Sequence, residues 1–411
     1  MVTLVGGSVR RTLFSMAFPM LAGTLAINLY NLTDAWFVSR LGTAALAAMG
    51  FTMPVVMLLG FAAGGLGTGV TTLTSHEIGR GDRAGAARLA THGMLLTAAV
   101  SVTLSALGYL SMEFIFSRLG ADSQTMPLIR RFMGIWYFGG LTMALPAIGN
   151  GLLMASGDSR AASQLMILGT VLNALLNPIL IFGYLGLPAM GIAGSALATV
   201  LAQAASTVWL LLLLHRRHHL LTMARWPIRE YLASFRRITS FAIPSVLSMV
   251  LAPLSIAVVT RLLSQFGSEV VAAVGTAGRI EMLAFVIPMA LGISLTPFVS
   301  QNYGAGRFDR ILEARQLSIR FALGYGGAVA VVFFLAMPWL ASAFSDDPKV
   351  LGPLVAYIRI IAFGYGLLEV HRYNGFFLTG LHRPAQATAL NVGRVLLLLL
   401  PLSFAGASIG G

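Results

Sequence analysis

The sequence is short of charge and has no cysteine. Of its 411 residues, 10% are Asp, Glu, Lys or Arg and 57% are hydrophobic, whereas a soluble globular domain carries about 25% charged residues. The absence of cysteine excludes disulfides, thiolate metal sites and cysteine nucleophiles. This composition is typical of a polytopic membrane protein and not of a soluble domain with a large core.

Motifs of enzymes and of nucleic-acid binding are missing as well. The glycine-rich stretch GFAAGGLGTG at 60–69 lies inside an apolar run and lacks the lysine of a P-loop. The net charge of +13 comes from basic residues in short loops, without a basic stripe. We therefore expect no enzymatic activity, no cofactor and no nucleic-acid partner, and the energy for any transport would come from an ion gradient.

Long apolar runs are abundant. About 20 apolar residues span a bilayer as a helix, and unpaired backbone groups in lipid force such runs to be helical. The predicted fold is an all-α integral membrane protein with six spans in a first bundle and five in a second. The spans are predicted near 13–38, 46–74, 88–112, 130–154, 162–183, 190–214, 239–263, 271–299, 317–340, 353–378 and 386–406.

The two halves of the chain are related by an internal repeat. SMAFP at 15–19 recurs as SFAIP at 240–244, and LGTAALAAMG at 41–50 recurs as FGSEVVAAVG at 266–275, both at an offset of 225. Because six spans precede the second copy, both copies start on the same side of the membrane. They are predicted to be parallel repeats that face each other across a central cavity.

The repeat divides the chain into three parts. An N-terminal six-helix bundle is expected at 1–214, a basic cytoplasmic linker at 215–237 and a five-helix bundle at 238–411. Basic residues cluster in the loops on the side of the N-terminus, which predicts a cytoplasmic N-terminus. The sixth span of the first copy has no counterpart in the second, so we expect a missing twelfth helix and favour a truncated product.

One carboxylate interrupts the first span. Between Thr12 and Val38, Asp34 is the one charged residue, and a charge at membrane depth costs about 2.5–3.5 kcal/mol on insertion scales. Asn31 precedes it by one helical turn, so both polar groups share a face. A polar face predicts a cavity and a coupling role for Asp34; the alternative is an interfacial residue near the outer end of the span.

The fifth span carries two amides one turn apart, Asn173 and Asn177, and Pro178 follows them. A kink at the proline would free carbonyl groups for ion binding. The amides would otherwise hold neighbouring helices together. Tyr137 in the fourth span is a candidate donor to Asp34, with aromatic packing as the alternative.

The second bundle has ionisable residues of its own. Glu281, Glu369 and His371 are candidates for the wall of the substrate cavity, because ionisable groups inside spans are functional candidates by default. Arg279 and Arg372 stand close to these acids in the sequence. Structural pairing of opposite charges is therefore the alternative interpretation.

Several of these features together resemble the multidrug and toxic compound extrusion (MATE) family. They are the Asp late in the first helix (YNLTDAWFVSRLG), QNYGAGR after the eighth span, and the NG-x-L-x-x-x-G pattern at 150–157 with its related copy NGFFLTGL at 374–381. The DinF-like branch is the most similar, and the resemblance covers the chain up to the expected last helix. It implies export of organic, often cationic, compounds in exchange for protons or sodium ions.

The resemblance also implies a set of coupling residues. Carried over, these are Asp34 on the first helix, Asn173 on the fifth, and a hydroxyl on the sixth that is Ser195 or Thr199, with Ser195 favoured. Asn177 stands where some relatives have a second Asp. A sodium ion at Asp34, Asn173 and Asn177 is conceivable, but the single carboxylate favours protons.

The sequence thus predicts a monomeric secondary transporter of the cell inner membrane that exports small organic, cationic compounds. One alternative is a flippase for lipid-linked oligosaccharides or polysaccharides with the same overall fold. The other is an inactive, truncated relative.

Overall fold

The computed structural model describes residues 4–344 and 347–409, and the regular secondary structure of these residues is helical throughout. Short 3-10 or π segments join some neighbouring helices. The α-helices are α1 (Val9–Ser39), α2 (Thr43–Gly79), α3 (Arg83–Leu110), α4 (Met112–Arg118), α5 (Met126–Phe138), α6 (Gly140–Ala155), α7 (Ser159–Phe182), α8 (Ile192–Leu212), α9 (Ile228–Leu263), α10 (Ser268–Gly304), α11 (Phe308–Ser342), α12 (Pro348–Ile361), α13 (Tyr365–Gly380), α14 (Pro384–Gly393) and α15 (Leu400–Ile409).

Most of these helices have the length and the apolar surface needed to cross a bilayer. Within the described residues, ten helical segments are long and apolar enough to cross a membrane, and α5 with α6, bent by 54°, makes an eleventh. Large apolar side chains on their outer faces are open to the surroundings, among them Phe18 (77% exposed), Phe138 (84%) and Trp339 (75%). Such faces are stable against lipid. The predicted all-α membrane fold with six and five spans is confirmed.

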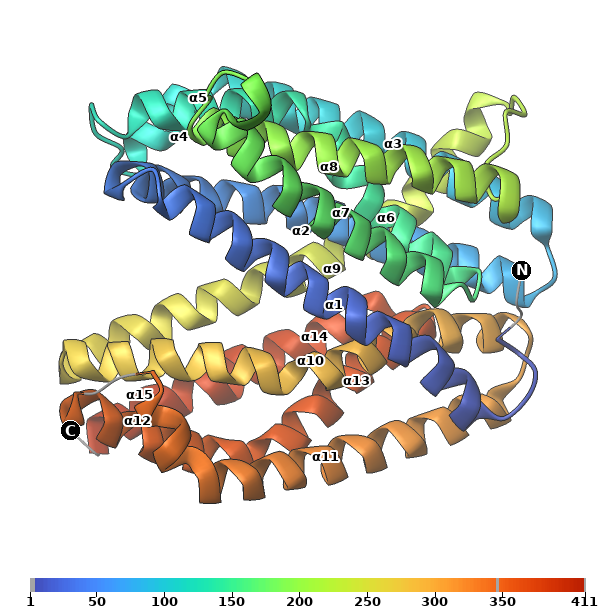
Figure 1. Cartoon of the computed structure of the whole chain (residues 1–411). Helices are drawn as coiled ribbons and strands as arrows, with labels where there is room; N and C mark the ends of the chain where they lie inside the picture. Colours follow the sequence, from blue (N-terminus) through green and yellow to red (C-terminus); the bar gives the residue numbers. More distant parts are fainter. Residues whose placement is uncertain (1–3, 345–346, 410–411) are drawn as a thin grey trace.

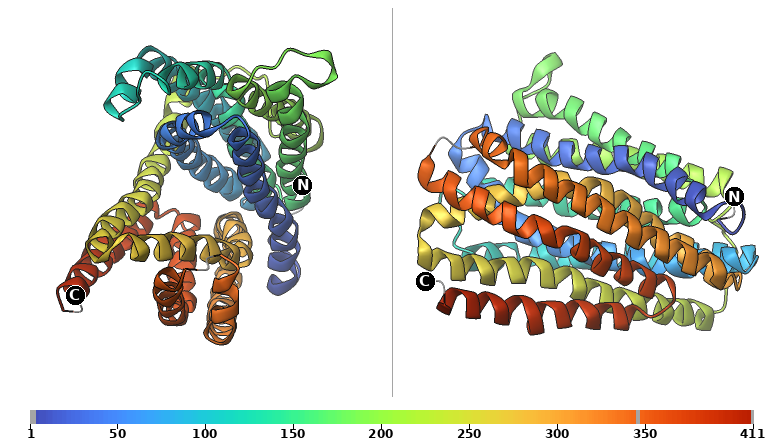
Figure 2. Two further views of the ribbon diagram at one scale, coloured as in Figure 1. Left: turned by 60° about the vertical axis from the view of Figure 1, so that its left-hand side comes forward. Right: turned by 90° about the horizontal axis from the view of Figure 1, so that it is seen from below.

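The spans form two lobes that lie side by side along the long axis of the molecule (Figures 1 and 2). We call α1–α8 the N lobe and α9–α15 the C lobe. The lobes touch where α2 packs against α9 and α10, and where α1 packs against α10. In Figure 1 they converge at the end that carries the N-terminus and diverge toward the other end, and we call these the closed end and the open end.

The connection between the lobes is shorter than the predicted linker 215–237. The helical segment that begins with α8 runs on to Arg217 as a π-helical turn, and α9 already begins at Ile228. The first turns of α9 pack against α3, where Ser234 Oγ lies 2.8 Å from His92 Nδ1 and Glu230 pairs with Arg88. The hydropathy pattern alone does not reveal these contacts.

The start of α7 is tied to this connection through Asp158. Asp158 caps α7 by accepting a hydrogen bond from the backbone N–H of Ala161 at 3.1 Å. Its Oδ2 lies 3.2 Å from His218 Nε2 and 3.1 Å from a guanidinium nitrogen of Arg217. The contact with His218 lowers the pKa of Asp158, and the cap and the charge of Arg217 act in the same direction.

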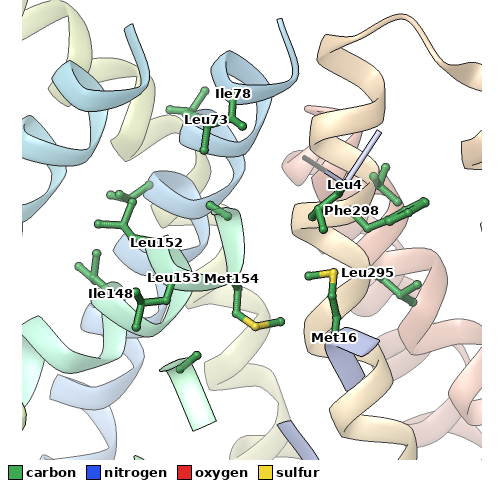
Figure 3. Close-up of a cluster of buried hydrophobic side chains, with 14 of the residues drawn as sticks. Leu4, Met16, Leu73, Ile78, Ile148, Leu152, Leu153, Met154, Leu295 and Phe298 are labelled. Carbon is green, nitrogen blue, oxygen red and sulfur yellow. The ribbon is translucent and has the colours of Figure 1, made fainter. Parts of the chain in front are cut away.

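A single apolar core joins the two lobes at the closed end. Leu4 and Met16 of the N-terminal region lie beside Leu295 and Phe298 of α10 in this core (Figure 3). At the open end each lobe has a core of its own instead. One gathers around Val38 and Phe116 of the N lobe, and the other around Met337 and Leu354 of the C lobe. The lobes are therefore fastened together at one end and separate at the other.

Two glycines bring α2 and α10 into backbone contact at the closed end. A Cβ on Gly79 would stand 2.0 Å from the carbonyl oxygen of Gln301, and one on Gly304 would stand 2.2 Å from that of His76. Both pairs are related by the repeat offset of 225, so the contact is reciprocal, as a two-fold axis between parallel repeats requires. Gln301 adds a cross-lobe bond of 2.6 Å from its Nε2 to the carbonyl oxygen of Ala155.

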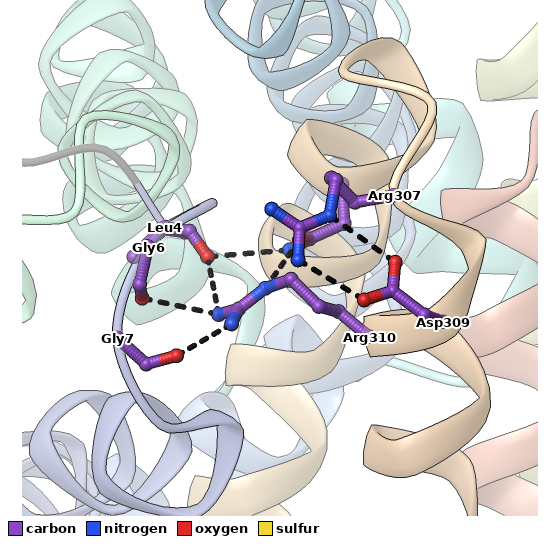
Figure 4. Close-up of polar contacts among 7 residues, drawn as sticks. Leu4, Gly6, Gly7, Arg307, Asp309 and Arg310 are labelled. Carbon is purple, nitrogen blue, oxygen red and sulfur yellow. Dashed lines mark hydrogen bonds and ion pairs between the residues drawn. The ribbon is translucent and has the colours of Figure 1, made fainter.

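The first described residues close this end further. Arg310 of α11 is 5% exposed, and its Nε donates to Oδ1 of Asn302 at 2.8 Å. Its other nitrogens donate to the carbonyl oxygens of Leu4, Gly6 and Gly7 (Figure 4). We call this arrangement the N-terminal clasp, because it holds the segment that leads into the N lobe against the C lobe.

Candidate functional site

Asp34 is buried inside the N lobe, near the open end of α1, and 5% of it is exposed. The packing of α1 against α7, and of α7 against α8, places the carboxylate among side chains of these three helices. Hydrophobic residues on the outer faces of the helices direct their few polar residues inward. Asp34 is therefore enclosed by protein and not open to solvent at the end of its span.

Four of the side chains singled out from the sequence meet here. Ser195 Oγ donates to Oδ1 of Asp34 at 2.8 Å, and Asn177 Nδ2 donates to the same oxygen at 3.1 Å. Asn177 Nδ2 also donates to Oδ1 of Asn173 at 3.0 Å. All three partners are completely buried. The side chains of α7 and α8 thus hold the carboxylate with two neutral donors.

The network continues to two residues on its far side. Asn173 Nδ2 donates to the hydroxyl of Thr199 at 3.1 Å, and the hydroxyl of Tyr30 donates to the same Thr199 oxygen at 2.9 Å. Thr199 was the second choice for the hydroxyl on this helix, and Tyr30 was missed. Its spacing of four residues from Asp34 is the signal that places it on the same helix face. We call the six side chains Tyr30, Asp34, Asn173, Asn177, Ser195 and Thr199 the Asp34 cluster.

No cation neutralises Asp34 among residues 4–344 and 347–409. The ion pairs of this part of the chain lie elsewhere, and none of its groups of acidic and histidine residues is arranged to hold a metal ion. One atom of the cluster, Oδ1 of Asn177, is buried and accepts no hydrogen bond. The cluster therefore holds the Asp34 carboxyl group with two neutral hydrogen-bond donors, and one unused acceptor lies beside it.

Two residues predicted to join Asp34 do not. Asn31 is exposed on α1, because α7 and α8 cover the face that carries residues 30 and 34. Tyr137 is buried, but its ring lies over Gly108 of α3, and its hydroxyl makes no hydrogen bond within the described part of the chain. The bend between α5 and α6 directs Tyr137 toward α3.

A cavity of about 730 Å³ lies between the two lobes. The N lobe contributes α1, α2, α6 and α7 to its wall, and the C lobe contributes α9, α10, α13 and α14. Methionines from both sides line it, including Met20 and Met154 opposite Met249 and Met289. Unbranched thioether side chains give a wall that adapts to differently shaped apolar ligands.

Of the three predicted cavity residues, one lines this space. His371 does, and its Nε2 lies 3.1 Å from Oδ1 of Asn391. Glu369 is 2% exposed and forms an ion pair with Arg372, so it faces the helices behind the wall. Glu281 accepts a hydrogen bond from the hydroxyl of Tyr365 at 2.9 Å within the C lobe, away from the cavity. The rotation of α10 and α13 thus contradicts the predicted cavity positions of both glutamates.

Comparison with known families accounts for this arrangement of two repeats. Residues 19–179 and residues 244–405 each match the family described as MatE, and the two matches begin 225 residues apart (244 − 19). The chain belongs to the MatE family. The members of the MatE family are membrane transporters, so this chain is a multi-pass transporter and not an enzyme.

Among curated proteins, the chain is 36% identical over 409 residues to a protein of Shewanella oneidensis named FAD transporter, covering 99% of this chain and 90% of that one. It is 26% identical to the Bacillus subtilis protein named probable multidrug resistance protein YoeA, covering 84% and 75%. The MatE fold superposes on the Vibrio cholerae MATE transporter VcmN in its bent form with a TM-score of 0.93, at 27% identity and covering 98% and 90%.

Proposed function

We propose that the protein exports organic compounds across the cell inner membrane and that protons bound at Asp34 drive this export. The N-terminus and the closed end then lie on the cytoplasmic side, as the distribution of arginines indicates. The working unit is a monomer with its own central cavity. Flavin adenine dinucleotide is the first compound to test, because a relative that matches along nearly the whole chain is named for its transport.

The observation that carries the proposal is a buried carboxylate without a counter-ion. Ser195 and Asn177 stabilise charged Asp34 by hydrogen bonds to one oxygen, but neither brings a positive charge. Taking a proton removes the cost of a buried charge, and losing it restores two charge-assisted hydrogen bonds. The two forms of Asp34 are thus close enough in free energy for a proton to bind and leave.

The geometry suggests how the proton alters the shape of the N lobe. Both hydrogen bonds to Asp34 come from α7 and α8, so neutralising the carboxylate weakens its hold on these helices. Pro178 follows Asn177 directly and removes one backbone hydrogen bond from α7, which makes this turn easy to bend. Protonation from the outside would bend α7, change the wall of the open cavity and release the substrate outward.

The cycle then closes on the other side. With the substrate gone, the lobes separate at the closed end, and Asp34 loses its proton toward the cytoplasm. The anionic carboxylate re-forms its bonds to Ser195 and Asn177, and a new substrate molecule enters. Sodium is the rival ion: the unused Oδ1 of Asn177 beside Asp34 would suit it, but one carboxylate offers it a single formal charge.

Gradients imposed on proteoliposomes test the proposal. Liposomes with the purified protein receive a fluorescent organic compound in the outer medium and either a proton gradient or a sodium gradient, each without the other. We expect the proton gradient alone to drive accumulation, and Asp34→Asn to abolish it. Accumulation driven by sodium alone, or unchanged in the variant, would refute proton coupling.

A further inference from the structure

The charge of the cavity wall is the opposite of what a receptor for cations needs. Among the described residues that line it, two are titratable, His371 and Arg372, and neither Asp nor Glu is present. The remaining polar groups are amides and hydroxyls such as Asn150, Asn391 and Thr388. The acids that stand near in the sequence point elsewhere. A ligand in this cavity therefore meets positive charge and hydrogen-bond donors.

Arg372 lines the cavity and is paired with Glu369, which does not line it. Its Nη1 pairs with Oε1 of Glu369, while its Nη2 lies 3.3 Å from the sulfur of Met289. The side chain of Arg372 is 31% exposed, but that of Glu369 is only 2% exposed. A guanidinium has five N–H donors, so most donors of Arg372 remain available to a ligand.

Aromatic rings also line this cavity. Phe376 lies one turn after Arg372 on α13, roughly 6 Å along the helix axis, and also lines the cavity. Phe61 of α2 lines it from the opposite lobe. Rings of this kind stack on the flat face of an aromatic ligand. The wall thus combines an anion-binding group with aromatic surfaces from both lobes.

We infer that the cavity selects aromatic compounds that carry a phosphate or diphosphate group, and that Arg372 is the residue that recognises this group. The inference rests on the proposed export function and specifies its substrate class. The planar guanidinium matches two phosphate oxygens at once, which a lysine cannot do. His371, one position earlier, is a second donor. In the tautomer with a proton on Nε2, this nitrogen can donate either to Oδ1 of Asn391 or to a ligand oxygen.

Glu369 has a defined part in this recognition. Its negative charge lies beside the guanidinium and opposes the approach of a second anion, while the phosphate binds the donors that Glu369 does not use. Glu369 therefore weakens phosphate binding at Arg372 without being displaced from it. Removing the charge of Glu369 strengthens phosphate binding, whereas removing Arg372 weakens it. Two substitutions in one ion pair thus change affinity in opposite directions, which a merely structural pair does not predict.

Binding of flavin adenine dinucleotide, of flavin mononucleotide and of riboflavin tests the inference on the purified full chain. Riboflavin differs from the mononucleotide by the phosphate alone, and from the dinucleotide by the diphosphate and the adenosine. We expect Arg372→Gln to weaken binding of both nucleotides at least tenfold and Arg372→Lys to weaken it less, with riboflavin affected by neither. Glu369→Gln should strengthen dinucleotide binding several-fold. Because Arg372→Gln leaves Glu369 buried and unpaired, the double variant with both glutamines serves as the foldable form and should bind as weakly as Arg372→Gln.

Arg279→Gln is the matched control, since Arg279 is an exposed arginine of the same lobe outside the cavity wall. Equal effects of Arg372→Gln on all three flavins, or tighter binding of a cationic dye than of the dinucleotide, would overturn the inference. So would saturation by a polyprenyl diphosphate in place of the dinucleotide, which would identify a lipid as the source of the phosphate. Proton-driven export of compounds without phosphate would leave the proposed function standing while this inference fails.

Discussion

Replacing Arg310 with alanine removes the N-terminal clasp. The guanidinium donates to one amide oxygen and to three backbone carbonyl oxygens, and a hydrogen bond from a charged group contributes about 1.5–3 kcal/mol. Four bonds at the lower value sum to about 6 kcal/mol. Water replaces about half of this at the membrane surface, so the variant should lose about 3 kcal/mol.

The loss of these hydrogen bonds destabilises the conformation in which the two lobes meet at the closed end. The three carbonyl groups belong to the segment that leads into the N lobe, so their bonds to Arg310 break when the closed end opens. The bond to Asn302 stays within the C lobe. The three bonds between the lobes account for about 2 kcal/mol of the loss, which corresponds to a roughly 30-fold shift in the equilibrium between the two conformations. We expect Arg310→Ala to populate the state that is open at the N-terminal end.

The absence of cysteine makes the shift measurable without background labelling. Spin labels on Arg40→Cys and Ser264→Cys, both exposed at the open end, report the separation of the lobes there. In Arg310→Ala a second population with a shorter distance should appear. Arg307→Ala is the control, because Arg307 pairs with Asp309 of its own lobe. If the two variants give the same distance distribution as the parent, the clasp does not hold the closed end.

Two further predictions concern the closed end and the start of α7. Gly79→Ala places a methyl group 2.0 Å from the carbonyl oxygen of Gln301 and should destabilise the closed conformation by about 1–3 kcal/mol. Gly50→Ala is the control: Gly50 faces open space on the same helix, so this variant should not change the distances between the spin labels. Asp158→Ala removes a helix cap and the partner of His218, and should lower the unfolding midpoint in detergent by about 1–3 °C. Because the pKa of Asp158 is lowered in the folded chain, its stabilisation is present above the ordinary range of aspartate and disappears as the pH falls through the lowered pKa. A difference between parent and variant that grows on acidification would contradict this account.

The fold was largely predictable because lipid leaves few choices. Apolar runs long enough to cross a bilayer must be helices, and the offset of 225 between repeated segments predicted two parallel bundles. The structure extends that repeat to single contacts, since Gly79 and Gly304 each meet the backbone of the other copy. The start of α9 was misplaced, because hydropathy marks where a helix enters the membrane and not where it begins.

For the Asp34 cluster, the sequence predicted which residue types take part better than it predicted which of them face the carboxyl group. Asp34 and the two asparagines were recognised, because polar groups inside a span are costly and therefore informative. Asn31 and Tyr30 both lie within one turn of Asp34, and only the packing of α7 and α8 decides that Tyr30 faces the cluster.

In the C lobe the sequence showed ionisable residues within spans but not the rotation of their helices. The packing around α13 buries Glu369 and leaves Arg372 at the surface of the cavity. Helix spacing cannot distinguish these outcomes, because residues 369 and 372 share a face and differ in depth of burial. The expected preference for cationic substrates came from the family resemblance and stays a prediction.

The most direct test of the account is a simultaneous record of proton movement and substrate export for the parent chain and Asp34→Asn. The amide keeps an oxygen that can accept from Ser195 and Asn177, so the variant loses the titratable charge and little else. In proteoliposomes with a pH-sensitive dye inside, we predict that adding an exported compound moves protons through the parent and moves none through the variant, which still binds the compound. Proton movement of equal size in both proteins would contradict the central role of Asp34.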